Sequence, residues 1–329
     1  MSVSNWANTY AASPGLFFEP SSIDEVASIL SFARARGLFV RIVGALRSPN
    51  DCAMADGVRA CMVSLRRLAT IHSIDKATGR VVVDGGALTS DINVALDNAG
   101  LALPNLGSIS AQTLAGAMAT GTHGTGASYG ILAANVVRIW LLTARGELLT
   151  LDARERPVLF RAALCSLGLL GVIVRLELQA VPAFHLQVTQ TPSTLSAVLA
   201  DLPKRAVSAQ YYRFHWYPHT DHVTEWRADA VEPLVLVAKA VPGAGAGAGA
   251  GGATAAAVTR WARGWSEWLL NYGFGYYALE AALYVAARTR ATWLTPKINA
   301  LWFWVLSRKP TTSCVRSFDA FNFNCLFQQ

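Results

Sequence analysis

Long side chains are almost absent from residues 105–126, which read NLGSISAQTLAGAMATGTHGTG. Between residues 107 and 126 the chain uses Gly, Ala, Ser and Thr, apart from a few aliphatic residues, Gln112 and His123. Glycine permits left-handed backbone conformations that point successive amide N–H groups to one side. Such a strip of amides and short hydroxyls suits a phosphate-rich ligand. A tightly packed turn between core elements explains the composition equally well, so both interpretations stay open.

The composition limits what kind of chain can surround this stretch. The 329 residues are enough for a large core and about two domains. The chain is 53% hydrophobic and 15% charged, with 10 Trp, which indicates large buried surfaces or contact with a membrane. The net charge of +7 favours an anionic lipid or an anionic cofactor. Because Lys and Arg are scattered and form no basic run, we expect no nucleic-acid partner.

The cysteines give no indication of a metal site, and the N-terminus gives no indication of a signal peptide. The chain has an odd number of cysteines without metal-type pairing, so we expect mostly reduced, buried thiols. They are Cys52, Cys61, Cys165, Cys314 and Cys325. The N-terminus lacks a charged segment followed by an apolar run, and no signal peptide is predicted.

The segment around residues 20–44 predicts a helix followed by a buried strand. Ser22 is the expected N-cap, Glu25 completes a capping box, and Gly37 ends the helix. The sequence LFVRIVG then predicts a strand that delivers the loop GALRSPN, at a position where α/β sheets tend to bind ligands. No GxGxxG motif follows the strand, so nicotinamide binding by a Rossmann motif is not expected.

The next segments predict one domain with two strand-rich halves. Helices are expected near 88–99 and 157–167. Strands are expected at 61–65, 71–75, 80–86, 135–143 and 172–181. Residues 15–182 are therefore predicted to form one α+β domain.

Beyond Pro182 the sequence changes character. Residues 210–226 form a strand-like aromatic segment that contains His215, His219 and His222. No carboxylate or cysteine strengthens this group at a ligand spacing, so we expect an aromatic sheet face and no metal. The run GAGAGAGAGG at 243–252 predicts a low-complexity surface insertion.

Aromatic and aliphatic residues concentrate at 261–306. The part at 268–287 is long enough to span a bilayer, but it contains Glu280 and two glycines. The part at 298–306 is too short to span and fits an interfacial apolar face. Buried helices of a second domain and attachment to a membrane surface both stay open. The glycine-rich loops and alternating strands argue against a multi-pass membrane protein.

The order of the motifs resembles one family. The matching segments run in register from near residue 5 to the C-terminus. They are NWANTY (5–10), EPSSIDEV (19–26), VGALRSPNDCAMADG (43–57), the stretch at 105–126, GILAANVV (130–137), LGLLGVIVRLELQAVP (167–182), YYRFHWYPHT (211–220) and the block ending in FNFNCLFQQ. The chain thus resembles the aldonolactone oxidases of the vanillyl-alcohol-oxidase type of flavoprotein, and within them the animal L-gulonolactone oxidase branch.

The resemblance implies an α+β fold with FAD as cofactor. A two-part FAD-binding domain, residues 15–182, is followed by an incomplete α+β cap or substrate domain, residues 183–329. The pyrophosphate is implied to contact Gly44, Ala45, Leu46, Arg47, Ser48, Gly107, Ser108, Ala115 and Gly116. The flavin site is implied to consist of Gly121, Thr122, His123, Gly124, Gly171, Val172 and Ile173. For His123, a structural hydrogen bond and direct chemistry both stay open.

The resemblance also implies the reaction. The C2 alcohol of an aldono-1,4-lactone, with L-gulono-1,4-lactone first, is oxidised with O2, giving hydrogen peroxide and a product that tautomerises to L-ascorbate. FAD carries the difficult step, and the protein positions the substrate. The oxidase branch has Gly at the position of Gly107 where a dehydrogenase branch has Ala, and the missing methyl group leaves a path for O2. The implied location is the endoplasmic reticulum membrane, with 261–306 as the membrane-surface candidate.

The sequence departs from the family at two places. In most relatives the loop at 44–48 reads Gly-Gly-Gly-His-Ser or Gly-Ser-Gly-His-Ser, and its His is bonded covalently to the flavin. Arg47 cannot form that bond, so we expect non-covalent FAD, with Arg47 able to pair with the pyrophosphate. Relatives also continue beyond the position of Gln329 with a Glu-x-Arg pair and a His-Trp-Ala-Lys motif. We therefore assign no catalytic residue and expect a truncated sequence, with a non-catalytic flavin-binding or membrane-associated remnant as the alternative to an active oxidase.

Overall fold

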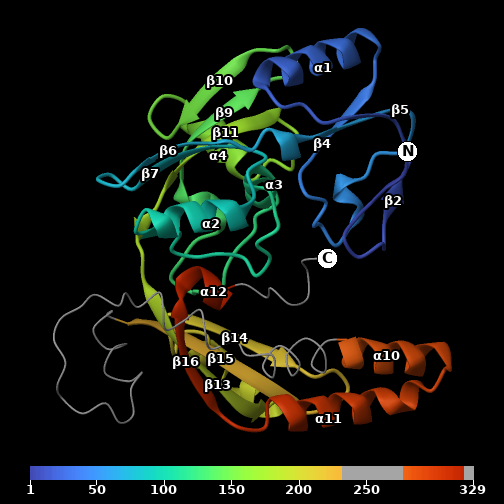
Figure 1. Ribbon diagram of the computed structural model, residues 1–329, viewed down its shortest axis with the longest axis vertical. Coiled ribbons are helices and arrows are strands. Elements are labelled where there is room, and N and C mark those ends of the chain that lie inside the picture. Colours follow the sequence, from blue (N-terminus) through green and yellow to red (C-terminus); the bar gives the residue numbers. More distant parts are fainter. Residues whose placement is uncertain (232–276, 322–329) are drawn as a thin grey trace, which may run out of the picture. The chain divides into compact units, whose positions relative to one another are not determined.

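The computed structural model describes residues 1–231 and 277–321. The predicted insertion at 243–252, residues 261–276 of the aromatic segment, and Cys325 lie outside the described residues. The described chain forms two compact units (Figure 1). Unit 1 consists of Met1–Gly124, Tyr129–Ala183 and, among the described residues at the C-terminal end, Phe321, and unit 2 consists of Thr125–Ser128 and the described residues of Phe184–Ala320. The domain boundaries at 182 and 183 stay a prediction.

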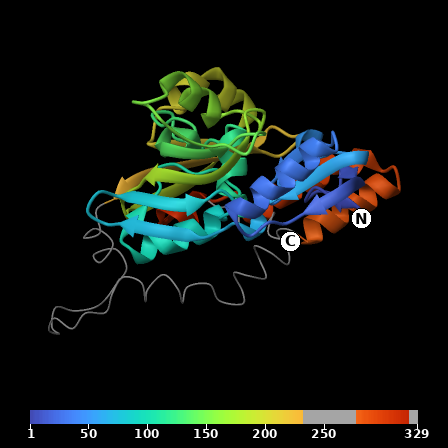
Figure 2. The same ribbon diagram turned by 90° about the horizontal axis from the view of Figure 1, so that it is seen from above.

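A parallel three-stranded sheet forms one part of unit 1. Its strands, in spatial order, are β3 (Pro14–Phe18), β5 (Gly57–Ser64) and β4 (Phe39–Val43). Helix α1 (Ile23–Ala35) packs on this sheet and lies beside its strands in Figure 2. The Ser22 hydroxyl accepts a hydrogen bond from the Glu25 amide at 3.1 Å, and Gly37 adopts φ +59° after the last turn. The predicted helix and both of its end signals are confirmed.

An antiparallel five-stranded sheet forms the other part of unit 1. Its strands, in spatial order, are β10 (Leu148–Asp152), β9 (Val136–Leu142), β11 (Val172–Gln179), β7 (Arg80–Asp84) and β6 (Ile71–Asp75). Figure 2 shows the β6–β7 hairpin extending as a two-stranded ribbon. The strand predicted at 71–75 is confirmed with the same bounds, and the run at 80–86 is a strand only as far as Asp84.

Short elements connect the two sheets of unit 1. They are β1 (Val3–Ser4), β2 (Ala11–Ala12), η1 (Asp51–Ala53), η2 (Leu65–Arg67), α2 (Thr89–Asn98), β8 (Leu101–Ala102), α3 (Leu114–Ala119), η3 (Leu132–Asn135), α4 (Pro157–Leu164) and β12 (Val181–Pro182). The small-residue stretch contains α3, a helix that the sequence did not predict. Helix α4 ends at Leu164, earlier than predicted, because Cys165 has non-helical backbone angles (φ −144°, ψ 61°), and the positive φ angles of Leu167 and Gly168 prevent the helix from resuming.

Unit 2 is built on an antiparallel four-stranded sheet. Its strands, in spatial order, are β14 (Tyr211–Trp216), β15 (His222–Val231), β13 (His185–Thr194) and β16 (Thr311–Arg316). Further elements are α5 (Leu195–Ala200), α6 (Leu202–Arg205), α10 (Leu279–Arg288), η5 (Thr292–Leu294), α11 (Thr295–Leu306) and α12 (Ser317–Phe321). The aromatic segment thus forms two strands, and no metal-type group of His, Cys, Asp and Glu occurs in the described part of the chain.

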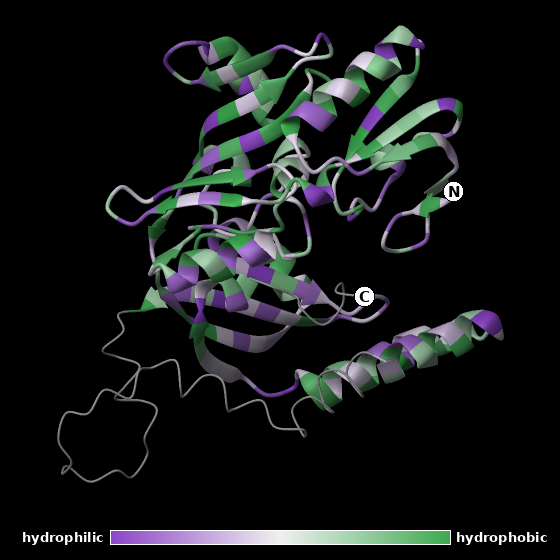
Figure 3. Ribbon diagram, turned by 45° about the horizontal axis from the view of Figure 1, so that its top comes forward, coloured by the Kyte–Doolittle hydropathy of each residue, from purple (hydrophilic) through white to green (hydrophobic). Residues whose placement is uncertain are grey.

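Large apolar side chains remain exposed on the helical pair α10 and α11 and on η5, the short turn between them. The exposed fractions are 67% for Tyr284, 63% for Trp293 and 56% for Trp304. Figure 3 shows hydrophobic and hydrophilic residues mixed along both helices. Within residues 1–231 and 277–321, no helix is long and apolar enough to span a bilayer.

The expectation of mostly buried thiols is wrong. All four described cysteines are free, but only Cys61 is buried. Cys52 and Cys165 are exposed because Cys52 lies on the short helix η1 and Cys165 directly after α4, and neither occupies a core-facing strand position. Burial raises the pKa of the Cys61 thiol, since a low-dielectric surrounding disfavours the thiolate.

A buried carboxylate ties α6 to the sheet of unit 2. Glu225 on β15 is 3% exposed and accepts hydrogen bonds from Arg205 at 2.5 Å, Arg227 at 2.5 Å and the Tyr212 hydroxyl at 2.9 Å. Burial alone would raise the pKa of Glu225, but these hydrogen bonds and the positive charges hold it below its ordinary value. Burial, together with Glu225, raises the pKa of Tyr212 to about 12. The group therefore holds the carboxylate charged near neutral pH.

Glu225→Gln should lower the free energy of unfolding by roughly 3 kcal/mol at neutral pH, because two arginines lose their buried counter-charge. Since the folded-state pKa is depressed, this stabilisation is present above the ordinary carboxyl pKa and is lost as the pH falls through the folded value. The urea midpoint measured against pH checks both effects. The exposed Glu155→Gln change is the control, and a variant as stable as this control at neutral pH would contradict the assignment.

Candidate functional site

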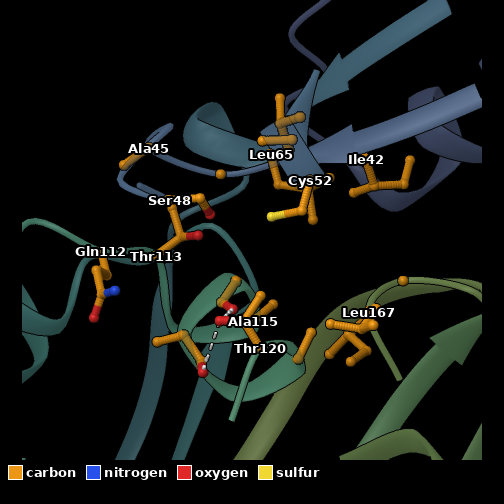
Figure 4. A pocket seen from close by; sticks show the side chains of 18 of the residues that line it. Ile42, Ala45, Ser48, Cys52, Leu65, Gln112, Thr113, Ala115, Thr120 and Leu167 are labelled. Atoms are coloured by element: carbon orange, nitrogen blue, oxygen red, sulfur yellow. Dashed lines mark hydrogen bonds between the residues drawn. The ribbon is translucent and has the colours of Figure 1, made fainter. Parts of the chain in front are cut away.

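A cavity of about 280 Å³ lies within unit 1, between the end of the parallel sheet, α3 and the start of β11. Figure 4 shows side chains from these elements converging on it, including Ser48, Leu65, Ala115 and Leu167. Its lining consists of residues 41–48, Cys52, Ala53, Leu65, Gln112, Thr113, residues 115–117, Ala119, Thr120, residues 167–169, Gly171 and Ile173. Because β3, β4 and β5 are parallel, their carboxyl ends share one edge, the edge at which α/β sheets bind ligands.

The loop at 44–48 begins at the carboxyl end of β4 and forms one wall. A β-carbon at Gly44 would lie 1.9 Å from Thr113 Oγ1, so the backbone passes α3 too closely for any other residue. Leu46 adopts φ +55°, a left-handed conformation that costs an ordinary side chain about 1–2 kcal/mol. The glycine that most relatives are expected to carry at this position avoids that cost.

A turn at the N-terminus holds this loop. Asn5 is 2% exposed and donates from Nδ2 to the Ser48 carbonyl at 3.1 Å, while its Oδ1 accepts from the amides of Thr9 and Tyr10. The Trp6 amide donates to the Leu46 carbonyl at 3.1 Å. These bonds fix the strained loop from outside the cavity, so the NWANTY segment positions residues 44–48.

Helix α3 forms the opposite wall. The amide of Ala115 donates to the Gly85 carbonyl at 3.0 Å, so Ala115 offers the cavity a small side chain and not a free amide. Gly116 lines the cavity beside Thr120, whose hydroxyl donates to the Gly116 carbonyl at 2.9 Å (Figure 4). A β-carbon at Gly85 would lie 2.2 Å from the Ile173 carbonyl oxygen, so α3 and β11 meet through a glycine as well.

The predicted residues at the start of β11 point in two directions. Gly171 and Ile173 line the cavity, and Gly171 adopts φ +148° close to the Leu142 carbonyl. Val172 is 2% exposed and packs in the apolar cluster under α1. Successive residues of a strand face opposite sides, so three consecutive positions cannot all line one cavity.

The remaining predicted residues do not line this cavity. Gly107 and Thr122 line a separate void of about 10 Å³, while Ser108 and Gly124 line neither. The amides of Gly121 and Thr122 donate to the carbonyls at the end of α3. His123 is exposed, and its Nδ1 lies 2.9 Å from the Gly124 carbonyl oxygen, which is the structural hydrogen bond considered from the sequence.

Close packing explains why Gly107 and Gly124 are glycines. A β-carbon at Gly107 would lie 2.6 Å from Thr122 Cγ2. A β-carbon at Gly124 would lie 1.8 Å from Asn105 Oδ1, whose residue is buried. Both interpretations of the small-residue stretch thus apply, because α3 faces a ligand-sized cavity while the following turn packs tightly.

The charge at the cavity is positive. Arg41 and Arg47 line it, and the Nε atoms of both are buried without a hydrogen-bond partner. Burial, and then the nearby charge of Arg66, lower the pKa of Arg47. No Asp or Glu occurs among the described lining residues. Buried guanidinium donors without a partner and a backbone too close for a β-carbon suit a ligand with negative phosphates, so the residues present fit the diphosphate of FAD.

Comparisons with known proteins agree with this geometry. The family model described as "FAD binding domain" matches residues 14–152, and the model described as "D-arabinono-1,4-lactone oxidase" matches residues 176–329. L-gulonolactone oxidase of Scyliorhinus torazame is 37% identical over 99% of this chain and 67% of that protein, and the enzyme of Bos taurus is 35% identical with the same coverage. The chain belongs to the FAD-dependent aldonolactone oxidase family.

Membership makes the chain an FAD-dependent oxidoreductase. A D-arabinono-1,4-lactone oxidase of Yarrowia lipolytica is 37% identical over 69% of this chain and 43% of that protein. Two structures of cholesterol oxidase from Brevibacterium sterolicum share the fold, with TM-scores of 0.60 and 0.59 at 17% identity, over 70% of this chain and 47% of that chain. The predicted α+β architecture with a two-part FAD-binding domain is thus confirmed.

Several residues that shape the site were not predicted. Asn5, Arg41, Gly85 and Thr113 act through contacts between segments that are far apart in sequence. For Asn5 a signal existed, since the NWANTY segment matched the family, but the sequence alone did not show what it holds. For Gly85 the signal was the glycine pair at the end of the predicted strand at 80–86, of which the observed strand covers only Arg80–Asp84.

Gly44→Ala should weaken FAD binding, because the new methyl group would displace the loop from Thr113. The double variant Gly44→Ala with Thr113→Ala should recover part of the loss, with a coupling of roughly 1–3 kcal/mol. Quenching of FAD fluorescence by the apoprotein measures the affinities of the wild type, both single variants and the double variant. Strictly additive effects would show that the close approach does not shape the cofactor site.

Proposed function

We propose that the chain oxidises an aldono-1,4-lactone at C2 with O2 as acceptor, with L-gulono-1,4-lactone as the substrate to test first, giving hydrogen peroxide and L-ascorbate. The observation that carries the proposal is the match to L-gulonolactone oxidases over 99% of this chain. The cavity supports this proposal, because the predicted loop at 44–48 lines it together with Ala115, Gly116, Gly171 and Ile173.

The described residues have binding and positioning roles in this proposal. Bound FAD would supply the acceptor for the hydride removed from C2, the hydroxyl proton would be released, and O2 would take up two electrons and two protons to give hydrogen peroxide. The loop at 44–48 and Arg47 hold the negative diphosphate, and Asn5 keeps the loop in place. Gly107 is proposed to leave O2 a path. Its close contact with Thr122 also gives it a packing role.

The cofactor is proposed to bind non-covalently, because Arg47 stands where the resemblance places the flavin-linked histidine. Acid precipitation of the FAD-loaded protein should therefore release the yellow chromophore into the supernatant. Retention of flavin absorbance in the washed pellet would contradict a non-covalent site.

Incubation with L-gulono-1,4-lactone and O2 should produce peroxide in step with loss of the lactone, measured on the FAD-loaded chain. The second candidate is a non-catalytic flavin-binding protein, which is favoured because Arg47 stands where the resemblance implies the flavin-linked histidine. Stoichiometric FAD binding without peroxide would favour that candidate, and failure to bind FAD would reject both. Galactono- and arabinono-lactone, tested in parallel, establish the substrate preference.

We further propose that α10, η5 and α11 contact a membrane surface, and the resemblance suggests the endoplasmic reticulum as that membrane. Trp293 and Trp304 are exposed, and each makes a cation–π contact. Lys297 Nζ lies 4.8 Å from the ring centroid of Trp293, and Arg308 Cζ lies 4.0 Å from that of Trp304. Exposed indole rings beside cations suit the boundary between acyl chains and anionic headgroups.

Vesicles containing phosphatidylserine should therefore co-sediment with the protein, and the double change Trp293→Ser with Trp304→Ser should reduce the bound fraction severalfold. Val58→Ser removes an apolar side chain that is 89% exposed in unit 1 and serves as the control. Equal binding of the double variant and the control would contradict the role of these helices.

A further inference from the structure

Arg41, Arg47 and Arg66 come from the end of the parallel sheet that opens on the cavity. Arg41 lies on β4, Arg47 in the loop after it, and Arg66 on η2 directly after β5. Leu65, next to Arg66, lines the cavity together with Arg41 and Arg47. The parallel arrangement of β4 and β5 thus brings three positive charges to one edge of the sheet.

These three arginines lack the carboxylate partners that Arg175, Arg205 and Arg227 have. Arg175 pairs with Asp84 at 3.0 Å, and Arg205 and Arg227 both pair with Glu225. In the described part of the chain, no carboxylate lies within ion-pair distance of Arg41, Arg47 or Arg66.

Grouping like charges without a counter-charge opposes folding. Burial and the charge of Arg66 both disfavour the protonated form of Arg47, as its lowered pKa shows. The Nε atoms of Arg41 and Arg47 are buried without an acceptor, and each such donor carries a desolvation cost. An anion in the cavity would remove both costs.

We propose that Arg41, Arg47 and Arg66 form a phosphate-binding set that holds the FAD diphosphate by charge-assisted hydrogen bonds and thereby replaces the covalent link of the family. This inference rests on the FAD binding of the proposed function. It predicts that the three side chains recognise the diphosphate and not the flavin ring. The planar guanidinium offers paired donors that match phosphate oxygens, so lysine would be a poorer substitute than its equal charge suggests.

The test measures the affinities of three ligands, FAD, ADP and riboflavin, for the apoprotein of this chain. Arg47→Gln should weaken FAD and ADP by a similar factor, roughly tenfold to a hundredfold, because both carry the diphosphate. Riboflavin lacks phosphate, so its affinity should not change. The loss should be smaller at high ionic strength, where the wild-type affinity is itself reduced by screening. Arg41→Gln and Arg66→Gln should act in the same direction.

Arg67→Gln is the matched control, since Arg66 and Arg67 are both exposed on the same turn and neither lines the cavity, but only Arg66 is the charge that, after burial, lowers the pKa of Arg47. A second readout separates binding from folding. The apo Arg47→Gln variant should unfold at an equal or higher temperature than the wild type, because the change relieves repulsion from Arg66. A purely structural role for Arg47 would lower that temperature.

The outcomes also separate this inference from the proposed function. If the wild type binds FAD and the Arg47→Gln and Arg66→Gln variants bind FAD and ADP as well as the Arg67→Gln control, the inference is overturned while the FAD site stands. An equal loss of riboflavin affinity would also overturn it, because the effect would then not be specific for phosphate. If the wild type binds neither FAD nor ADP, the proposed function fails together with the inference.

Discussion

Backbone segments of unit 1 approach one another at distances that leave no room for a β-carbon. A β-carbon at Gly44 would lie 1.9 Å from Thr113 Oγ1, and one at Gly86 would lie 1.7 Å from the Leu65 carbonyl oxygen. These contacts join the end of the parallel sheet to α3 and to the end of β7. The cavity exists because the two sheets of unit 1 meet through glycines and not through side chains that would fill the space.

Charge is arranged differently in the two units. In unit 2 the buried Glu225 has two arginine partners, so its negative charge is fully paired within the protein. At the cavity of unit 1, Arg41 and Arg47 have buried donors and no acidic partner among the described residues. The first arrangement is complete without a ligand. The second is completed by an anion, which agrees with membership of an FAD-dependent family.

Local signals allowed much of unit 1 to be predicted. The cap at Ser22, the stop at Gly37 and the alternating strand at 71–75 each depend on a few neighbouring residues, and each is confirmed. The site was predictable in part, because the loop at 44–48 follows a strand end that the sequence shows. The helix α3 was not, because its residues lack the periodic polar face that marks a surface helix.

What could not be predicted depends on pairing between distant segments. Val172 was assigned to the cofactor site, but successive side chains of a strand face opposite sides, so the side chain of Val172 points into the apolar core. The support of the loop by Asn5 and the Glu225 network each need partners that only the folded chain brings together. The resemblance supplied residue positions, whereas the structure showed that the amide of Ala115 is already used by Gly85.

If the cavity at the end of the parallel sheet binds the diphosphate of FAD, a crystal structure of the chain soaked with FAD will show it there. We expect phosphate oxygens to lie within hydrogen-bond distance of the backbone at residues 44–48 and of the Arg47 guanidinium, with no covalent bond between protein and flavin. A diphosphate bound elsewhere, with the Arg47 side chain turned away from it, would contradict the proposed cofactor site.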